Sequence, residues 1–187
     1  MTPGPALTLT FFGRFRALSS AARTITMLAA ARALDPGLQL RVRCQGGLDA
    51  TDRALAMEAG VSALFESYES THGEASLSLL TGSDVLLLSS ETGRDEIIPA
   101  KLFDYLAAAR PVLSLCENPD VADILARTGA GTQCPDPQRA AQVLVACAQA
   151  KRSGAGLPIA AELDLNARDA LSARTTTRRL ATLLHDA

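Results

Sequence analysis

Short runs rich in apolar residues alternate along this chain with longer segments whose apolar residues recur every three or four positions. That alternation is typical of βαβ units, in which helices cover both faces of a parallel sheet. Six runs are predicted as strands: Leu7–Phe12, Gln39–Cys44, Ala63–Glu66, Asp84–Ser89, Pro111–Leu115 and Gly131–Gln133. The sequence therefore predicts an α/β fold with a Rossmann-like, doubly wound parallel sheet of about six strands.

The segments with helical period predict the crossover helices and the end of the domain. They are Ala21–Leu34, Ala50–Ala59, Glu74–Leu80, Pro99–Ala109, Val121–Arg127 and Pro137–Lys151. We predict a single domain over residues 1–187, with a core at 7–151, a linker at 152–160 and a helical tail at 161–186. Within the last two parts, Ser153–Pro158 is rich in Gly and Ala, and Leu163–Leu184 has the helical pattern.

Composition narrows the possible partners and the compartment. The 187 residues are 48% hydrophobic, and 20 acidic residues nearly balance 18 basic ones, so neither nucleic acid nor an anionic membrane is expected as the main partner. No apolar run is long enough to cross a bilayer, and the first residues do not resemble a signal peptide, which predicts a cytoplasmic protein. The four cysteines form no CxxC pair, which favours free thiols over disulfides or a zinc site.

The segment from Ser89 to Leu115 carries the strongest chemical signal, because an apolar strand there leads into a polar loop and a helix that starts near Pro99. Proline suits the first helical position, where its missing N–H has no intrahelical partner anyway. We expect the amides of Ala100, Lys101 and Leu102 to point out of the helix start, where the helix dipole favours an anion. The sequence therefore predicts a phosphate site at this helix.

The predicted helix has a polar face and an apolar face. Its spacing places Lys101, Asp104 and Tyr105 together, opposite Leu102, Phe103 and Leu106, which we expect to pack on the sheet. Lys101 is then placed to meet a phosphate, Asp104 to accept hydrogen bonds from a ribose diol, and Glu96 to project into the same cleft. The alternative is that Lys101 and Asp104 form only a solvated surface pair, and the pattern alone leaves both interpretations open.

The stretch Glu96-Ile-Ile-Pro-Ala-Lys-Leu-Phe-Asp104, continued by YLAAARPVL, resembles the donor-binding, carboxyl-terminal domain of retaining GT-B glycosyltransferases. These are the group 1 enzymes with two acidic residues separated by seven others. The pieces FFGRF, RVRCQGG, HGEASLSLLTGSDVLLL and SARTTTRRLATLL agree with that family in order and spacing, so the resemblance covers nearly the whole chain.

The resemblance implies roles for individual residues. Glu96 would contact the hydroxyls of the donor sugar, Asp104 would hold the nucleotide ribose, and amides from Pro99 to Leu102 would receive the diphosphate. Arg14 matches the first member of the family's basic pair, which stabilises the leaving diphosphate. The second member is normally a lysine before a glycine, and here SSAAR makes Arg23 a nearby substitute. The base would lie beside Ser67 and Tyr68, and Asp104 replaces the family's usual glutamate.

The resemblance also implies the partners. The expected ligand is a nucleoside diphosphate sugar, such as a UDP-sugar, with no other cofactor and no metal required. The family's amino-terminal acceptor domain has no counterpart in this sequence, so we expect this chain to bind donor but hardly to transfer sugar alone. An acceptor domain or partner chain would then complete a hexosyltransferase acting on a carbohydrate, lipid or small-molecule acceptor.

Two other functions stay open at this stage. One is a non-catalytic nucleotide-binding or scaffold domain, and the other is a further GT-B-fold enzyme, such as a sugar-nucleotide epimerase. Among single residues, His72 is more often a surface residue than a catalyst, and Glu91 with Asp95 would make only a weak cation site. Arg178 and Arg179 either form a solvated face or belong to a tail that packs on an acceptor domain.

Overall fold

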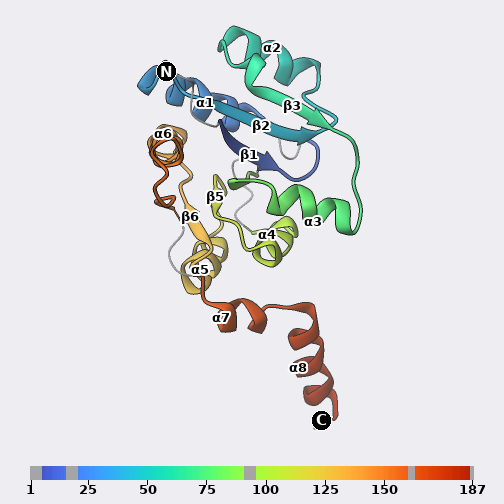
Figure 1. Cartoon of the computed structure of the whole chain (residues 1–187). Helices are drawn as coiled ribbons and strands as arrows, with labels where there is room; N and C mark the ends of the chain where they lie inside the picture. Colours follow the sequence, from blue (N-terminus) through green and yellow to red (C-terminus); the bar gives the residue numbers. More distant parts are fainter. Residues whose placement is uncertain (1–5, 16–20, 91–95, 160–162, 186–187) are drawn as a thin grey trace.

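The computed structural model describes residues 6–15, 21–90, 96–159 and 163–185. Within this part of the chain, six parallel strands form one sheet in the order β3-β2-β1-β4-β5-β6 (Figure 1). The strands are β1 (Leu7–Phe11), β2 (Leu40–Gln45), β3 (Phe65–Tyr68), β4 (Val85–Leu88), β5 (Val112–Ser114) and β6 (Gly131–Gln133). The predicted Rossmann-like sheet is confirmed, with its strand order reversing between β1 and β4.

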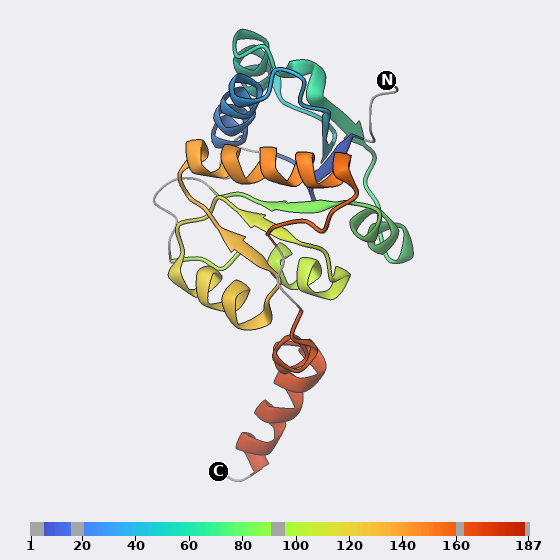
Figure 2. The ribbon, with the colours of Figure 1, turned by 60° about the vertical axis from the view of Figure 1, so that its left-hand side comes forward.

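Helices connect the strands and cover the sheet. They are α1 (Ala22–Leu34), α2 (Ala50–Glu58), α3 (Glu74–Thr81), α4 (Lys101–Ala108), α5 (Pro119–Thr128), α6 (Pro137–Ser153), α7 (Leu165–Ala170) and α8 (Ala173–His185). Figure 2 shows α6 lying across one face of the sheet, with α4 and α5 on the other side. This two-sided cover explains why β1 and β4 are buried along their whole length.

Two hydrophobic clusters form the core, one on each face of the sheet. Val85 and Leu87 of β4 belong to the cluster under α1 and α6, whereas Leu86 and Leu88 belong to the cluster under α4 and α5. This division follows from the strand period of two, because successive side chains point to opposite faces. The same alternation assigns side chains near the strand ends to one face or the other.

The amino-terminal edge of the central strands is tied together by one carboxylate. Asp84 accepts a hydrogen bond of 2.7 Å from the Thr8 amide of β1 and pairs with Lys151 at the end of α6. Beside it, the hydroxyls of Thr10 and Ser83 lie 2.6 Å apart. The amino edge therefore has its buried polar groups partnered across three elements.

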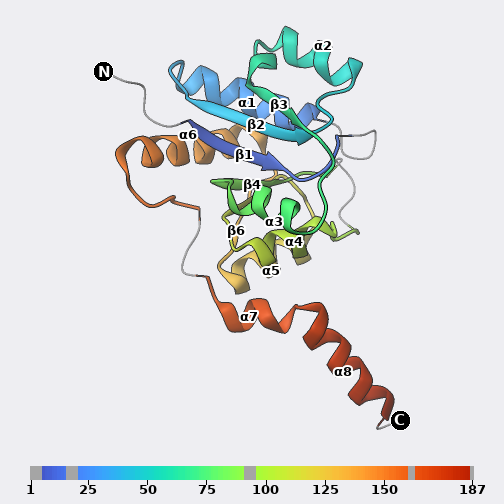
Figure 3. The same ribbon diagram turned by 45° about the vertical axis from the view of Figure 1, so that its right-hand side comes forward.

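Two elements differ clearly from the prediction. The strand expected at Ala63–Glu66 lies two residues later, because Ser62–Leu64 forms a 3₁₀ turn before β3. The tail is two helices instead of one, since the Ser172 hydroxyl accepts the Thr175 amide and starts a new helix there. Figures 1 and 3 show this tail extending away from the sheet.

The remaining sequence predictions on membrane spans and cysteines can be compared with the described residues. None of the helices in this part of the chain combines the length and the apolar character that a bilayer-spanning helix needs. The four cysteines are free, and three are buried, whereas Cys134 is half-buried. Burial raises the pKa of the Cys44 and Cys147 thiols to about 11, which keeps them protonated at neutral pH.

Candidate functional site

The turn that follows β1 lies at the point where the strand order reverses, where open α/β sheets bind their ligands. Lys101, the first residue of α4, extends to this turn, and its Nζ lies 3.9 Å from the centre of the Phe11 ring. A Cβ on Gly13 would lie 3.1 Å from the Lys101 Cε, and Gly13 has a φ of +119°. Glycine is therefore required at position 13 both for the backbone turn and for the approach of the lysine.

Two tyrosine hydroxyls hold the end of β1. The Phe12 amide donates to the Tyr105 hydroxyl at 2.9 Å, and that hydroxyl donates to the Leu87 carbonyl at 3.0 Å. The Gly13 amide donates in the same way to the Tyr68 hydroxyl at 2.8 Å. These bonds engage the Phe12 and Gly13 amides, so these two N–H groups do not face an anion here.

The position of Tyr105 corrects the predicted faces of α4. Tyr105 is fully buried, whereas Phe103, expected to face the sheet, is 43% exposed. The buried side of the helix comprises Leu102, Tyr105, Leu106 and Ala108. The tyrosine ring supplies more apolar area than its hydroxyl costs once that hydroxyl is hydrogen bonded, so it packs inward. Burial raises the pKa of Tyr105 well above its usual value.

Arg14 follows Gly13 and lies against Gly46, where a Cβ would lie 3.1 Å from the arginine Nε. Its exposed side chain lines an open hollow of about 670 Å³ together with Ser67, Tyr68 and other residues at the ends of β2 and β3. Ser67 and Tyr68, expected in a loop, are the last residues of β3. Tyr68 and Arg14 line the same hollow, and the Tyr68 hydroxyl is hydrogen bonded to the β1 turn.

Asp104 is exposed and lines a second hollow, of about 370 Å³, between α3 and α4. Phe12, Thr71 and His72 also line it. Because Phe12 adjoins Gly13 and Arg14, the hollow at Asp104 and the cationic turn after β1 are neighbours along one edge. The hollow with Asp104 and His72 therefore adjoins the turn at which Lys101 and Arg14 lie.

The start of α4 differs from the predicted phosphate cradle. The helix begins at Lys101 with Ala100 as its cap, and Pro99 precedes the cap instead of occupying the first helical position. The Leu102 amide, expected to point outward unpaired, donates to the Pro99 carbonyl at 2.9 Å. A tight first turn thus removes Leu102 as an anion ligand. Ala100 and Glu96 are exposed ahead of the helix.

The start of α1 is held by a carboxylate from another helix. Asp52 of α2 is 4% exposed, and its Oδ2 accepts the Ala21 amide at 3.0 Å. In the first turn of α1, Arg23 Nη2 pairs with Glu117 at 3.1 Å and donates to the Pro135 carbonyl at 2.5 Å. Arg23 therefore joins α1 to the segments that follow β5 and β6, away from Arg14's hollow.

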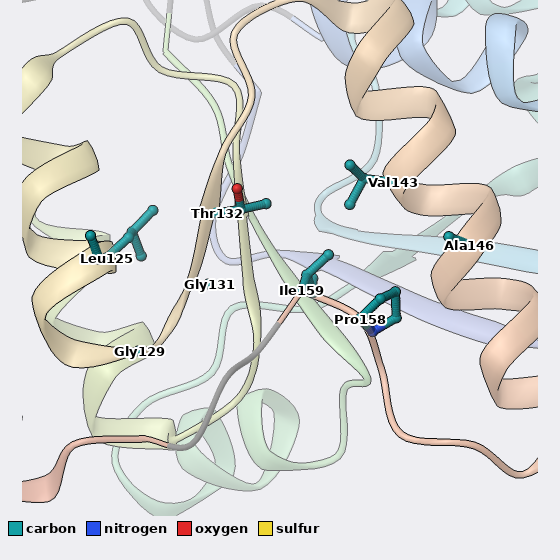
Figure 4. Close-up of a pocket in the computed structure, with 9 residues that line it drawn as sticks. Leu125, Gly129, Gly131, Thr132, Val143, Ala146, Pro158 and Ile159 are labelled. Atoms are coloured by element: carbon teal, nitrogen blue, oxygen red, sulfur yellow. The ribbon is translucent and has the colours of Figure 1, made fainter.

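A third hollow, of about 460 Å³, lies beside β6 between α5 and α6 (Figure 4). Its lining includes Leu125, Val143, Pro158 and Ile159, and none of the lining residues is charged. This hollow lacks the polar groups that a phosphorylated ligand needs.

Glu91 and Asp95, considered above as a weak cation site, lie outside the described residues. The residues that are described contain no cluster of three metal-ligating side chains.

Comparison with solved structures agrees with the fold. The pneumococcal O-GlcNAc transferase GtfA, in complex with UDP and GlcNAc, matches with a TM-score of 0.65 at 10% identity, over 99% of this chain and 37% of that chain. The C-terminal domain of LpcC, a glycosyl transferase group 1 family protein from Francisella tularensis, matches with a TM-score of 0.53 at 16% identity, over 75% and 74% of the two chains. The chain has the fold of one half of a GT-B glycosyltransferase.

Other comparisons define the extent of this likeness. AviGT4, a glycosyltransferase involved in avilamycin A biosynthesis, matches with a TM-score of 0.61 at 17% identity, over 97% of this chain and 52% of that chain. The chain thus spans about a third to a half of the length of GtfA and AviGT4. No protein-family model matches the sequence, and no curated protein is detectably similar to it.

The GT-B half brings together several of the residues predicted from sequence, and it separates others. Arg14, Lys101 and Tyr68 meet at the turn after β1, with Asp104 in the adjoining hollow. Arg23 is engaged elsewhere, by Glu117. Sequence reasoning missed Asp52, because a helix cap supplied from another helix leaves no local pattern. It also missed Glu117, although the loop after Leu115 lies at the carboxyl end of a predicted strand.

Proposed function

We propose that this chain binds a nucleoside diphosphate sugar and serves as the donor half of a glycosyltransferase. The observation that carries the proposal is the placement of Lys101 against Gly13 and of Arg14, the next residue, against Gly46, at the end of β1 where the strand order reverses. Two cations at this position suit a diphosphate, and such charges stabilise a leaving group as the sugar departs. The solved structure of GtfA, which shares the fold, contains UDP and GlcNAc.

The hollow at Asp104 takes the nucleoside in this proposal. Its carboxylate is exposed to accept hydrogen bonds from a ribose diol, and His72 and Phe12 offer ring surfaces for a base. Phe12 lines this hollow and directly precedes Gly13 and Arg14, so it connects the nucleoside position to the cationic turn. The assignment keeps the ribose role of Asp104 and moves the base from Ser67 and Tyr68 to the α3 side.

Glu96 takes the donor sugar in this proposal. It lies exposed in the segment that leads into α4, four residues before Ala100, the cap of the helix. An exposed carboxylate can accept hydrogen bonds from sugar hydroxyls. Transfer of the sugar then requires an acceptor side supplied by a further domain or partner chain.

Calorimetric titration with UDP, GDP and ADP, each alone and as a sugar conjugate, tests the proposal. We expect one nucleotide to bind selectively and its sugar conjugate to bind more tightly. Absence of binding to all six ligands, by protein shown to be folded by circular dichroism, would contradict the proposal and favour a scaffold role.

Two substitutions separate the roles of the carboxylates. We expect Asp104→Ala to weaken the nucleotide and its sugar conjugate alike, and Glu96→Ala to weaken only the conjugate. Asp123→Ala provides the control, since Asp123 is an exposed carboxylate on α5 that pairs with Arg127. Equal losses for both ligands in Glu96→Ala would refute the sugar role of Glu96.

A further inference from the structure

Four buried side-chain atoms in the described part of the chain lack a hydrogen-bond partner: Arg23 Nη1, Thr24 Oγ1, Ser89 Oγ and Ser90 Oγ. Leaving a buried polar group unpaired costs free energy, and folded proteins rarely tolerate it without a reason. All four atoms come from segments next to the carboxyl ends of the central strands: the first turn of α1 and the residues directly after β4. Their concentration at that edge indicates a place prepared for hydrogen bonds that the chain does not make by itself.

Ser89 points to the face of the sheet that α1 covers. It continues the alternation of Val85 and Leu87, whose side chains belong to the core cluster under α1 and α6. Ser89 is 4% exposed, and Thr24, on the buried side of α1, is fully buried. The two unpaired hydroxyls are therefore on the same side of the sheet, one in the first turn of α1 and one directly after β4.

Glu117 reaches the same place from β5. Leu115 belongs to the cluster under α1 and α6, and alternation assigns Glu117, two residues later, to that side. The Leu115 amide donates to the Leu88 carbonyl at 2.7 Å, which sets the end of β5 beside Ser89. The bond of 3.1 Å between Glu117 and Arg23 then connects this edge to α1.

The charge of this group differs from that of the turn after β1. Arg23 is paired with Glu117, so the pair offers hydrogen bonds without net charge, whereas Lys101 lies against Gly13 and Arg14 against Gly46, and both side chains are cationic. A phosphate gains most from cationic side chains. A neutral group with many hydroxyls gains most from an ion pair and hydroxyls that supply both donors and acceptors.

We propose that Arg23, Thr24, Ser89 and Glu117 form a subsite for the hydroxyls of the donor sugar. The ion pair is the part that solvent reaches, with 17% of the Arg23 and 36% of the Glu117 side chain exposed, and the two buried hydroxyls add hydrogen-bonding groups that the chain leaves unpaired. This inference rests on the proposed function, and it gives Arg23 a different role from the diphosphate contact expected from sequence. Arg23 and Glu117 recognise the sugar, and Arg14 and Lys101 hold the phosphates.

Ser89→Ala and Thr24→Val test the subsite, because each removes a hydroxyl with little change in shape. We expect each variant to bind the bare nucleoside diphosphate as wild type does and to bind its sugar conjugate roughly 3- to 10-fold more weakly, as for a lost neutral hydrogen bond. The melting temperature without ligand should stay the same or rise, since an unpaired buried group is removed. Thr26→Ala, an exposed position of the same helix, is the control.

Each other outcome overturns the subsite in a recognisable way. Unchanged affinities for both ligands would mean that the two hydroxyls hold only buried water. Equal weakening of both ligands would mean that these residues contact the phosphates or have only a structural role. If folded wild-type protein binds no nucleoside diphosphate at all, the proposed function itself fails, a result distinct from normal nucleotide binding without sugar dependence.

Discussion

Helices α1 and α4 both begin at the carboxyl edge of the sheet, on either side of the point where the strand order reverses, yet their first turns are built differently. The start of α1 receives the buried carboxylate of Asp52, an anion that the chain supplies itself. The start of α4 receives the carbonyl of Pro99 and extends the cation of Lys101 toward Gly13. The comparison shows that a helix start at the end of a strand is not by itself a phosphate site.

A helix start that already holds an internal anion has little left to offer a phosphate, because the partial positive charge there is neutralised. We therefore propose that Asp52 stabilises α1 and that the phosphates of a ligand bind near Lys101 and Arg14. Four experiments test this difference between the two helix starts, and they follow in order of expected effect.

The first concerns the attachment of α4. Tyr105→Ala removes a fully buried ring and both hydrogen bonds of its hydroxyl, so the free energy of unfolding should fall by about 3–5 kcal/mol in urea titrations. Tyr105→Phe keeps the ring and should lose only about 1–3 kcal/mol. A loss below about 1 kcal/mol for the alanine variant would show that α4 is not anchored through this residue.

The second concerns the internal anion of α1. Asp52→Ala removes the acceptor of the Ala21 amide, and the free energy of unfolding should fall by about 1–3 kcal/mol. Glu58→Ala, at an exposed position of the same helix, should change it by less than about 0.5 kcal/mol. Equal effects of the two substitutions would remove the distinction drawn here between the two helix starts.

The third concerns the cation of α4. Lys101→Met keeps an apolar chain over Phe11 but removes the charge, and affinity for the bound nucleoside diphosphate should fall about 10- to 100-fold, as for a lost charge-assisted hydrogen bond. Arg127→Met on α5 controls for net charge. Calorimetry at low and high salt completes the measurement, and wild-type affinity in Lys101→Met would place the phosphates elsewhere.

The smallest effect is a pH dependence. Burial raises the pKa of Tyr105 in the folded protein above its usual value of 10, so the unfolded chain loses this proton first as the pH rises. The free energy of unfolding should therefore be unaffected well below pH 10 and decrease above it. Urea titrations at pH 9 and pH 11 should show a smaller decrease for Tyr105→Phe than for wild type, and parallel decreases would contradict the assignment.

The sequence predicted the sheet well because its central strands are buried on both faces and read as apolar runs of the right length, such as Val85–Leu88. It predicted the faces of α4 less well, since a tyrosine counts as polar on a helical wheel although its ring packs as an apolar group. The two-residue displacement of β3 arose from Ser62–Leu64, a 3₁₀ turn whose apolar residues resemble the start of a strand.

The site could be predicted only where one segment carries its own signal. Lys101 begins a predicted helix and was named from local pattern, whereas Arg14 was named from the resemblance to the glycosyltransferase family. The pairing of Arg23 with Glu117 joins residues 94 positions apart, and no periodicity connects them. The unpaired hydroxyl of Ser89 became visible only when the packing of α1 over the sheet was known.

The Tyr105 hydroxyl bridges β1 and β4 where the two strands separate at the carboxyl edge of the sheet. The β1–β4 ladder pairs Leu9 with Val85 and Thr10 with Leu86, and beyond it the Phe12 amide reaches the Leu87 carbonyl only through the phenol oxygen. Two bonds of 2.9 and 3.0 Å thus stand where one direct bond would join closed strands. The phenol oxygen thus acts as a spacer between β1 and β4, at the point where the two strands stop pairing directly.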